Sequence, residues 1–172
     1  RIKKDFGTAR PPADGIGLDG LQRAWAHIER ATQNGQDRDA RLNMMSASMQ
    51  GAMAFQKGLG CVHSLSHSLG GVDPRLHHGT LNAVLMPAVL RFNRAAIGPK
   101  WEQLHRFFGE APDVAVARLN QRLGMPSGLT AMGVTEEMLQ PVAADAMKDH
   151  CHATNPRTAT PDDYVAILRD SA

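Results

Sequence analysis

Four of the chain's eight histidines lie between residues 63 and 78, which makes this stretch the first candidate for chemistry. His63 and His67 are four residues apart, so on a helix both imidazoles project from the same face, one turn from each other. A glycine pair and then an Asp-Pro pair follow, and these favour the end of a helix and a turn. After such a turn, His78 can return toward the first two imidazoles.

Three neutral imidazoles without a nearby thiolate pair suit zinc, iron, copper or nickel. They favour a catalytic site, in which the metal keeps an open position, over a closed structural site. The alternative is that these residues are ordinary, because histidines four apart also occur on amphipathic helices, where one caps a carbonyl and the other is half exposed. The spacing alone leaves both interpretations open.

The order of residues around these histidines is more specific than their spacing. Residues 60–70 read G-x-x-H-x-x-x-H-x-x-G, and residues 78–87 read H-G-x-x-N-A-x-x-x-P. Together they resemble the second metal-binding segment of the iron-containing (group III) alcohol dehydrogenases. The resemblance extends to the run P-P-A-D at 11–14, to residues 44–60, and to the runs A-T-N-P-R and T-P-D-D near the end. It therefore covers nearly the whole chain from about Arg10.

In that family one aspartate and three histidines hold a divalent metal, usually ferrous iron and sometimes zinc. The metal polarises the substrate oxygen for hydride exchange with a nicotinamide cofactor, NAD or NADP. The resemblance implies that His63 and His78 are metal ligands, and that His67 lies beside the metal, near the nicotinamide and the substrate, where it relays a proton. The interval from His63 to His78 is one residue longer than the family pattern, so His77 is the alternative ligand. We prefer His78 because Gly79 follows it.

Two parts of a complete enzyme of this family have no counterpart in the sequence. The family's aspartate and first histidine lie in a D-x-x-x-H segment before the position matched by Pro11, and residues 1–9 contain Asp5 but no histidine. The N-terminal dinucleotide-binding domain is also missing, because the glycine cluster at 15–20 follows no strand and the Val- and Ile-rich strands of a parallel sheet are absent. The resemblance therefore implies the C-terminal domain or a fragment of an alcohol dehydrogenase, which converts an alcohol reversibly to an aldehyde or ketone and is inactive as this fragment alone.

From the same resemblance we expect a small-molecule alcohol or aldehyde as substrate, the missing N-terminal domain as a partner, and a homodimer. One alternative function is a non-catalytic metal-binding module that uses His63, His67 and His78 alone. Another is an oligomerisation module whose interface is the apolar helix expected at about 80–96. Only the dehydrogenase explains why glycine, histidine, asparagine and proline follow one another in this order.

The composition favours helices over strands, because Ala, Leu and Met recur while only one tyrosine and five phenylalanines are present. We predict an all-α multi-helix bundle, with a single helical metal-site domain over residues 10–172 and a divergent or disordered segment over 1–9. The methionines at about 37–57 could line a substrate pocket, but we expect them to fill a core. Besides the histidine segment, we expect helices over Pro11 to Gly35, 37–57, 80–96, 101–108, 112–123 and 135–150, and a last helix from about 160. Pro87 is expected to kink or interrupt the helix at 80–96.

The formal net charge of +2 is too small and too scattered for a nucleic-acid surface. No run of about 18 apolar residues exists and the first ten residues lack a signal-peptide core, so we expect a cytoplasmic protein without membrane partners. Such a location argues against a disulfide between Cys61 and Cys151. The run His150-Cys151-His152 resembles a metal cluster only superficially, because adjacent helical residues point in different directions.

Overall fold

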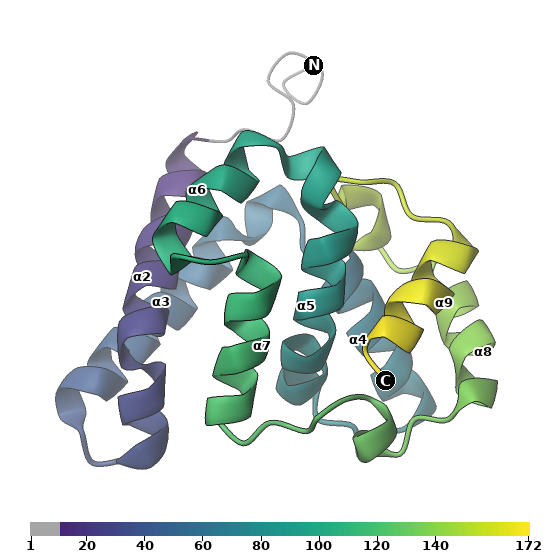
Figure 1. Ribbon diagram of the computed structural model, residues 1–172, viewed down its shortest axis with the longest axis horizontal. Helices are drawn as coiled ribbons and strands as arrows, with labels where there is room; N and C mark the ends of the chain where they lie inside the picture. The colour runs from purple at the N-terminus through teal and green to yellow at the C-terminus, as the bar shows by residue number, and fades with distance from the viewer. Residues whose placement is uncertain (1–10) are drawn as a thin grey trace. The chain divides into compact units, whose positions relative to one another are not determined.

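The computed structural model describes residues 11–172, and within that range it contains helices and no strand (Figure 1). The predicted all-α fold is confirmed. The described residues divide into two compact units, the first ending at Gly58 and the second running from Leu59 to Ala172. The segment predicted at 1–9 lies outside the described residues, and the single domain predicted over 10–172 stays a prediction. None of the helices in the described range is both long and apolar enough to cross a lipid bilayer.

The first unit is a pair of helices, α2 (Pro11–Gln33) and α3 (Arg38–Ala54), followed by the 3₁₀ turn η1 (Phe55–Lys57). Asp37 starts α3, since its side chain accepts a hydrogen bond from the Ala40 amide at 3.0 Å. Such a cap satisfies one of the backbone donors that a helix leaves without a partner at its beginning.

Small residues let α2 and α3 approach each other closely. A Cβ added to Gly20 of α2 would lie 3.1 Å from Gln50 Cβ and 3.3 Å from the Ala47 carbonyl oxygen, both on α3. A Cβ on Gly17 would lie 3.6 Å from Ala54 Cβ. These glycines therefore lie inside a helix and serve helix packing.

The long apolar side chains of α3 lie on its other face. Leu42, Met45, Met49 and Met53 are 64%, 68%, 61% and 49% exposed. The prediction that the methionines fill a core was wrong for these three. Because α3 packs on α2 through residues such as Ala47, its long apolar residues, which recur at helical spacing, face away from that contact.

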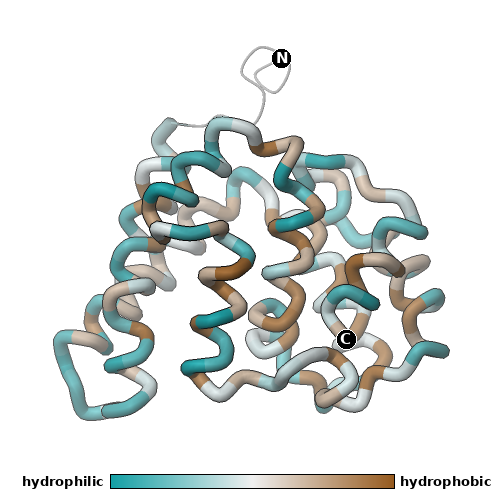
Figure 2. The backbone as a smooth tube through the Cα atoms, viewed as in Figure 1, coloured by the Kyte–Doolittle hydropathy of each residue, from teal (hydrophilic) through white to brown (hydrophobic). Residues whose placement is uncertain are grey.

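The second unit is built around one central helix (Figure 1). Its elements are α4 (Cys61–Val72), α5 (His78–Ile97), α6 (Pro99–Phe108), α7 (Pro112–Arg122), η2 (Thr130–Met132), α8 (Glu136–Ala146), η3 (His152–Thr154) and α9 (Pro161–Asp170). Helix α5 contacts α4, α6, α7 and α9. Its hydrophobic residues are coloured brown along the tube in Figure 2, and Leu81, Leu85 and Val89 among them are buried. The expectation that this apolar helix is central to the bundle is confirmed.

Helix α5 continues through Pro87. Proline has no amide hydrogen, so the carbonyl four residues earlier, that of Ala83, loses its helical partner. Asn120 of α7 donates a hydrogen bond from its side-chain Nδ2 to this carbonyl at 2.7 Å. An interruption at Pro87 was therefore the wrong expectation, because a neighbouring helix satisfies the carbonyl that proline leaves free.

The start of α4 is fixed by the side chain of Asn155, which lies in the loop before α9. Asn155 Oδ1 accepts hydrogen bonds from the Cys61 amide and from Asn93 Nδ2 of α5, both at 3.1 Å, and Asn155 Nδ2 donates to Asn93 Oδ1 at 2.7 Å. Gly60 leaves the room for this contact: its φ is +72°, and a Cβ there would lie 2.7 Å from Asn155 Oδ1. The first glycine of the histidine motif is therefore required by an asparagine far along the chain.

The substitution Gly60→Ala should lower the free energy of unfolding by roughly 2–4 kcal/mol, because it strains the backbone and displaces the Asn155 amide. Gly70→Ala is the matched control. Gly70 lies inside α4 with nothing within 4 Å of an added Cβ, so alanine there should stabilise the chain by about 0.5–1 kcal/mol. Urea unfolding followed by circular dichroism measures both values. Equal effects of the two substitutions would contradict the assignment of Gly60 to this contact.

Candidate metal centre

Helix α4 presents His63 and His67 on one face, and the chain turns back so that His78 is the first residue of α5. The ring centroids are 5.7 Å apart for His63 and His67, 5.3 Å for His63 and His78, and 5.3 Å for His67 and His78. The structure thus brings together the three histidines that the sequence singled out.

The turn that returns the chain is held by Asp73, the residue that follows α4. Asp73 Oδ1 accepts a hydrogen bond from the Arg75 amide at 3.0 Å, and the Arg75 guanidinium forms an ion pair with the same carboxylate at 2.8 Å. These contacts lower the pKa of Asp73 to about 2, with the Arg75 side chain as the largest cause. An aspartate that accepts from the backbone two residues on is a typical turn former, which explains why the chain leaves the helix here.

Asn82, one helical turn after His78, reaches two of the three rings. Its Nδ2 lies 3.0 Å from His78 Nε2 and 3.4 Å from His63 Nε2. The two ring nitrogens therefore converge on one point, and Asn82 Oδ1 is buried without a hydrogen-bond partner. Unsatisfied buried amide oxygens are uncommon and call for an explanation. Two imidazole nitrogens that meet at one side chain are ligand atoms that fit a divalent metal such as iron or zinc.

Ser66 sets the hydrogen position on His78. Its Oγ donates to the His63 carbonyl at 3.2 Å and lies 3.3 Å from His78 Nδ1. Because the hydroxyl carries a single hydrogen, we infer that Ser66 accepts the hydrogen of Nδ1. The lone pair of His78 is then on Nε2, the nitrogen that faces Asn82. Contacts of this kind orient a metal-binding imidazole from its far side.

His77 has a different environment. It is the N-cap of α5, where its Nδ1 accepts a hydrogen bond from the Thr80 amide at 3.3 Å and lies 3.1 Å from Thr80 Oγ1. A ring held in this way caps the helix that His78 begins. Of the two alternative ligands, the geometry brings His78 to His63 and His67.

The protonation of His63 also suits a ligand. Burial lowers the pKa of His63 below its ordinary value, and the neighbouring His78 and His67 lower it further, because a second positive charge nearby is repelled. His63 is therefore neutral at pH 7, which is the form that binds a metal ion.

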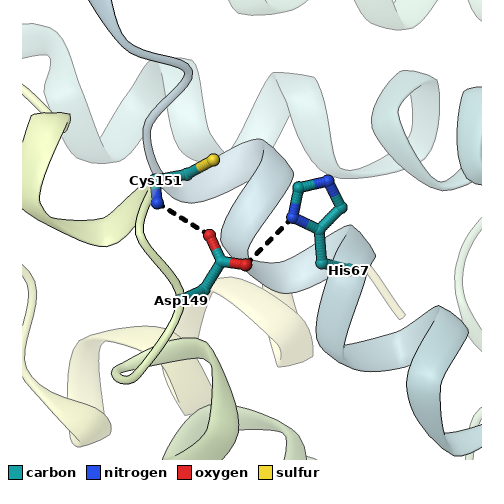
Figure 3. Close-up of side chains that lie close together, drawn as sticks. All are labelled: His67, Asp149 and Cys151. Carbon is teal, nitrogen blue, oxygen red and sulfur yellow. Dashed lines mark hydrogen bonds and ion pairs between the residues drawn. The ribbon is translucent and has the colours of Figure 1, made fainter.

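A further group of polar contacts joins His67 to the turn after α8 (Figure 3). The sequence predicted a helix that continues to His150, but α8 ends at Ala146. In the turn that follows, Asp149 Oδ2 lies 3.0 Å from His67 Nδ1, and Asp149 Oδ1 accepts a hydrogen bond from the Cys151 amide at 2.7 Å. Possible ligand atoms of His67, Asp149 and Cys151 all lie within 4.8 Å of one another.

The sequence did not predict that Asp149 contacts His67 or that the Asn82 side chain contacts His63 and His78. The predicted helix over 135–150 put Asp149 in a last helical turn, from which no approach to His67 could be inferred. His150 is exposed and its Nε2 lies 3.4 Å from Cys151 Sγ, whereas His152 Nδ1 lies 2.9 Å from the buried Tyr164 hydroxyl. The two histidines therefore diverge, but His150 and Cys151 contact each other, which was not expected for neighbours on a helix.

The comparison with known protein families decides the affiliation of the chain. Residues 7–172 match the model of the C-terminal part of the Fe-containing alcohol dehydrogenase family. The chain belongs to the iron-containing alcohol dehydrogenases. It is 61% identical over 173 residues to a 4-hydroxybutyrate dehydrogenase of Cupriavidus necator, and 35% identical over 176 residues to an NAD-dependent methanol dehydrogenase of Bacillus methanolicus.

These alignments cover 94% and 95% of this chain but 45% and 46% of the two relatives. A crystal structure of a 1,3-propanediol oxidoreductase superposes with a TM-score of 0.92 and 30% identity, over 96% of this chain and 47% of that one. The chain thus corresponds to the helical C-terminal part of an oxidoreductase family and spans about half the length of the iron-containing alcohol dehydrogenases it matches. The family resemblance seen in the sequence is confirmed.

Both cysteines are buried and neither forms a disulfide within the described residues. Burial raises the pKa of each thiol to about 11. At pH 8 the native chain should therefore react with a thiol-specific disulfide reagent more than about a hundredfold more slowly than the unfolded chain, because the thiolate is the reactive form. Release of the coloured leaving group, with and without denaturant, measures the two rates. Fast reaction of Cys151 in the native chain would contradict its burial.

Proposed function

We propose that this chain is the metal-site half of a metal-dependent, NAD- or NADP-linked alcohol dehydrogenase, which reversibly oxidises a primary alcohol to the aldehyde. The observation that carries the proposal is the convergence of His63 Nε2 and His78 Nε2 on the Asn82 side chain. Family membership supports the same reaction. The substrate that we propose is an ω-hydroxy acid of the 4-hydroxybutyrate type, since that compound gives its name to the relative at 61% identity.

In this proposal His63 and His78 would hold the metal ion through Nε2, where the ion would replace the Asn82 amide hydrogens, and Ser66 would orient the His78 ring from its Nδ1 side. The ion is ferrous iron or zinc, and when bound it polarises the substrate oxygen. The remaining ligands, an aspartate and a histidine, come from the part of the enzyme that precedes the matched segment in the relatives. We accordingly expect the isolated chain to bind metal through an incomplete set of ligands.

His67 is the proposed proton carrier and the residue next to the nicotinamide. It is 37% exposed, so substrate can reach it, and its ring lies 5.3 Å from that of His78. In the oxidation, His67 would accept the proton of the alcohol hydroxyl. NAD or NADP, when bound, would supply the acceptor for the hydride of the alcohol carbon, and the product is the aldehyde. The reverse sequence reduces the aldehyde.

The cofactor is proposed to bind to an α/β domain outside this chain, because the described residues contain helices alone. Relatives of about twice the length provide the room for such a domain. The predicted homodimer and the predicted cytoplasmic location are part of the same proposal.

Calorimetric titration of the chain with Zn²⁺ tests the ligands. We expect His63→Ala and His78→Ala each to weaken binding by more than about tenfold, because each removes one of two nitrogen donors. The control His77→Asn removes an imidazole at the neighbouring position and keeps an N-cap residue, so its affinity should equal that of the unmodified chain. Loss of binding in His77→Asn with none in His78→Ala would contradict the ligand assignment.

A fusion protein tests the reaction. The segment of the Cupriavidus necator relative that precedes the matched region is joined to this chain, and NAD reduction is followed at 340 nm, the ordinary wavelength for NADH, with 4-hydroxybutyrate. The fusion should be active, and His63→Ala in it should lower kcat/KM by at least about a hundredfold. A folded fusion that reduces neither NAD nor NADP with any alcohol would overturn the proposed function.

A further inference from the structure

The contact between His67 and Asp149 joins two elements that are far apart in the sequence (Figure 3). His67 lies on α4 and Asp149 lies in the turn after α8, a helix that packs against α4. The Asp149 side chain is only 16% exposed, whereas that of His67 is 37% exposed. An imidazole with this much exposure has several side-chain rotamers open to it. A carboxylate that is held in place beside one ring nitrogen favours the one rotamer in which the two groups are hydrogen-bonded.

The two oxygens of Asp149 have different partners. Oδ1 accepts the Cys151 amide hydrogen at 2.7 Å, and Oδ2 faces His67 Nδ1 at 3.0 Å. Burial opposes ionisation of Asp149, but hydrogen bonds from the Cys151 amide and from His67 outweigh it and lower the pKa of the carboxyl. An ionised carboxylate can only accept hydrogen bonds, so the hydrogen of this contact belongs to His67 Nδ1.

The position of this hydrogen determines which nitrogen of His67 is basic. With Nδ1 protonated, the neutral ring carries its lone pair on Nε2, at the far side from Asp149. The ring is also stacked on His78, with centroids 5.3 Å apart and planes 16° apart. His67 is thus held at one edge by Asp149 and over one face by His78.

We propose that Asp149 is a positioning residue for His67, which it holds in the Nδ1–H tautomer so that Nε2 is the nitrogen that accepts the alcohol proton. The role of Nε2 rests on the proposed function, whereas the tautomer depends only on contacts within this chain. Carboxylates that hold a histidine through Nδ1 fix its tautomer and orientation in other enzymes by the same physics.

Asp149→Asn tests the tautomer directly. The Cys151 amide needs an oxygen acceptor, so the new amide oxygen takes the place of Oδ1 and the new amide nitrogen faces His67 Nδ1. A donor at that position requires the lone pair on Nδ1 and moves the hydrogen to Nε2. The substitution should therefore reverse the tautomer of His67 while it changes the side-chain volume little.

Long-range ¹H–¹⁵N spectra of the 172-residue chain with labelled histidine report the tautomer. They are recorded near pH 8, above the ordinary histidine pKa of about 6.5. We expect the Nδ1–H pattern for His67 in the unmodified chain and the Nε2–H pattern in Asp149→Asn. Asp145→Asn is the matched control, because Asp145 is exposed and pairs with Lys148. It should leave the His67 signals unchanged.

In the fusion protein described above, Asp149→Asn should lower kcat by about 10²- to 10⁴-fold with little change in KM, and Asp149→Glu should recover part of the loss. A fusion that is inactive before any substitution overturns the proposed function alone, since the spectra do not depend on activity. An unchanged His67 tautomer in Asp149→Asn, or the Nε2–H tautomer already in the unmodified chain, overturns the positioning role.

Zn²⁺ supplies a last discriminating outcome. The His63→Ala, His78→Ala double variant should bind Zn²⁺ only weakly, and removal of Asp149 or Cys151 from it should leave that weak affinity unchanged. Binding by the double variant that is lost in Cys151→Ser would show that His67, Asp149 and Cys151 act as a metal cluster, and it would overturn the positioning role.

Discussion

The position of the histidine helix depends on one close contact, that of the Asn155 amide with the backbone at Gly60 and Cys61. The contact requires a residue without a side chain at position 60, and it also engages Asn93 of α5. One side chain therefore sets where α4 begins relative to α5. Since His63 and His67 lie on α4 and His78 on α5, the same contact sets the distances between the imidazoles.

Each imidazole is then oriented by a different polar group. Ser66 contacts Nδ1 of His78, Asn82 lies between the Nε2 atoms of His63 and His78, and Asp149 contacts Nδ1 of His67. These contacts exist within the protein alone. A metal ion that binds to rings oriented in advance loses less free energy to ordering of the side chains, which is the general benefit of preorganisation.

The sequence predicted well what depends on local order. Helical periodicity located the helices to within a few residues, and the order of glycines, histidines and asparagine identified the family. It did not predict contacts that bring distant side chains together, such as Asp149 with His67 or Asn120 with the Ala83 carbonyl, because neither partner carries a local sign of the other. The exposed methionines Met45 and Met49 could not be predicted for the same reason. Apolar residues tend to be buried, but the face of α3 that packs on α2 consists of small residues, so the methionines lie on the exposed face.

The proline inside α5 links the stability of two helices. A helix interrupted by proline is poorly stable by itself, since nucleation is costly and the bond lost at Pro87 divides the segment into two short halves. In the folded unit the side chain of Asn120, on α7, donates a hydrogen bond to the Ala83 carbonyl, which Pro87 leaves without a helical partner. Docking of α7 therefore stabilises α5 across its proline, and this contact couples the stability of the two helices.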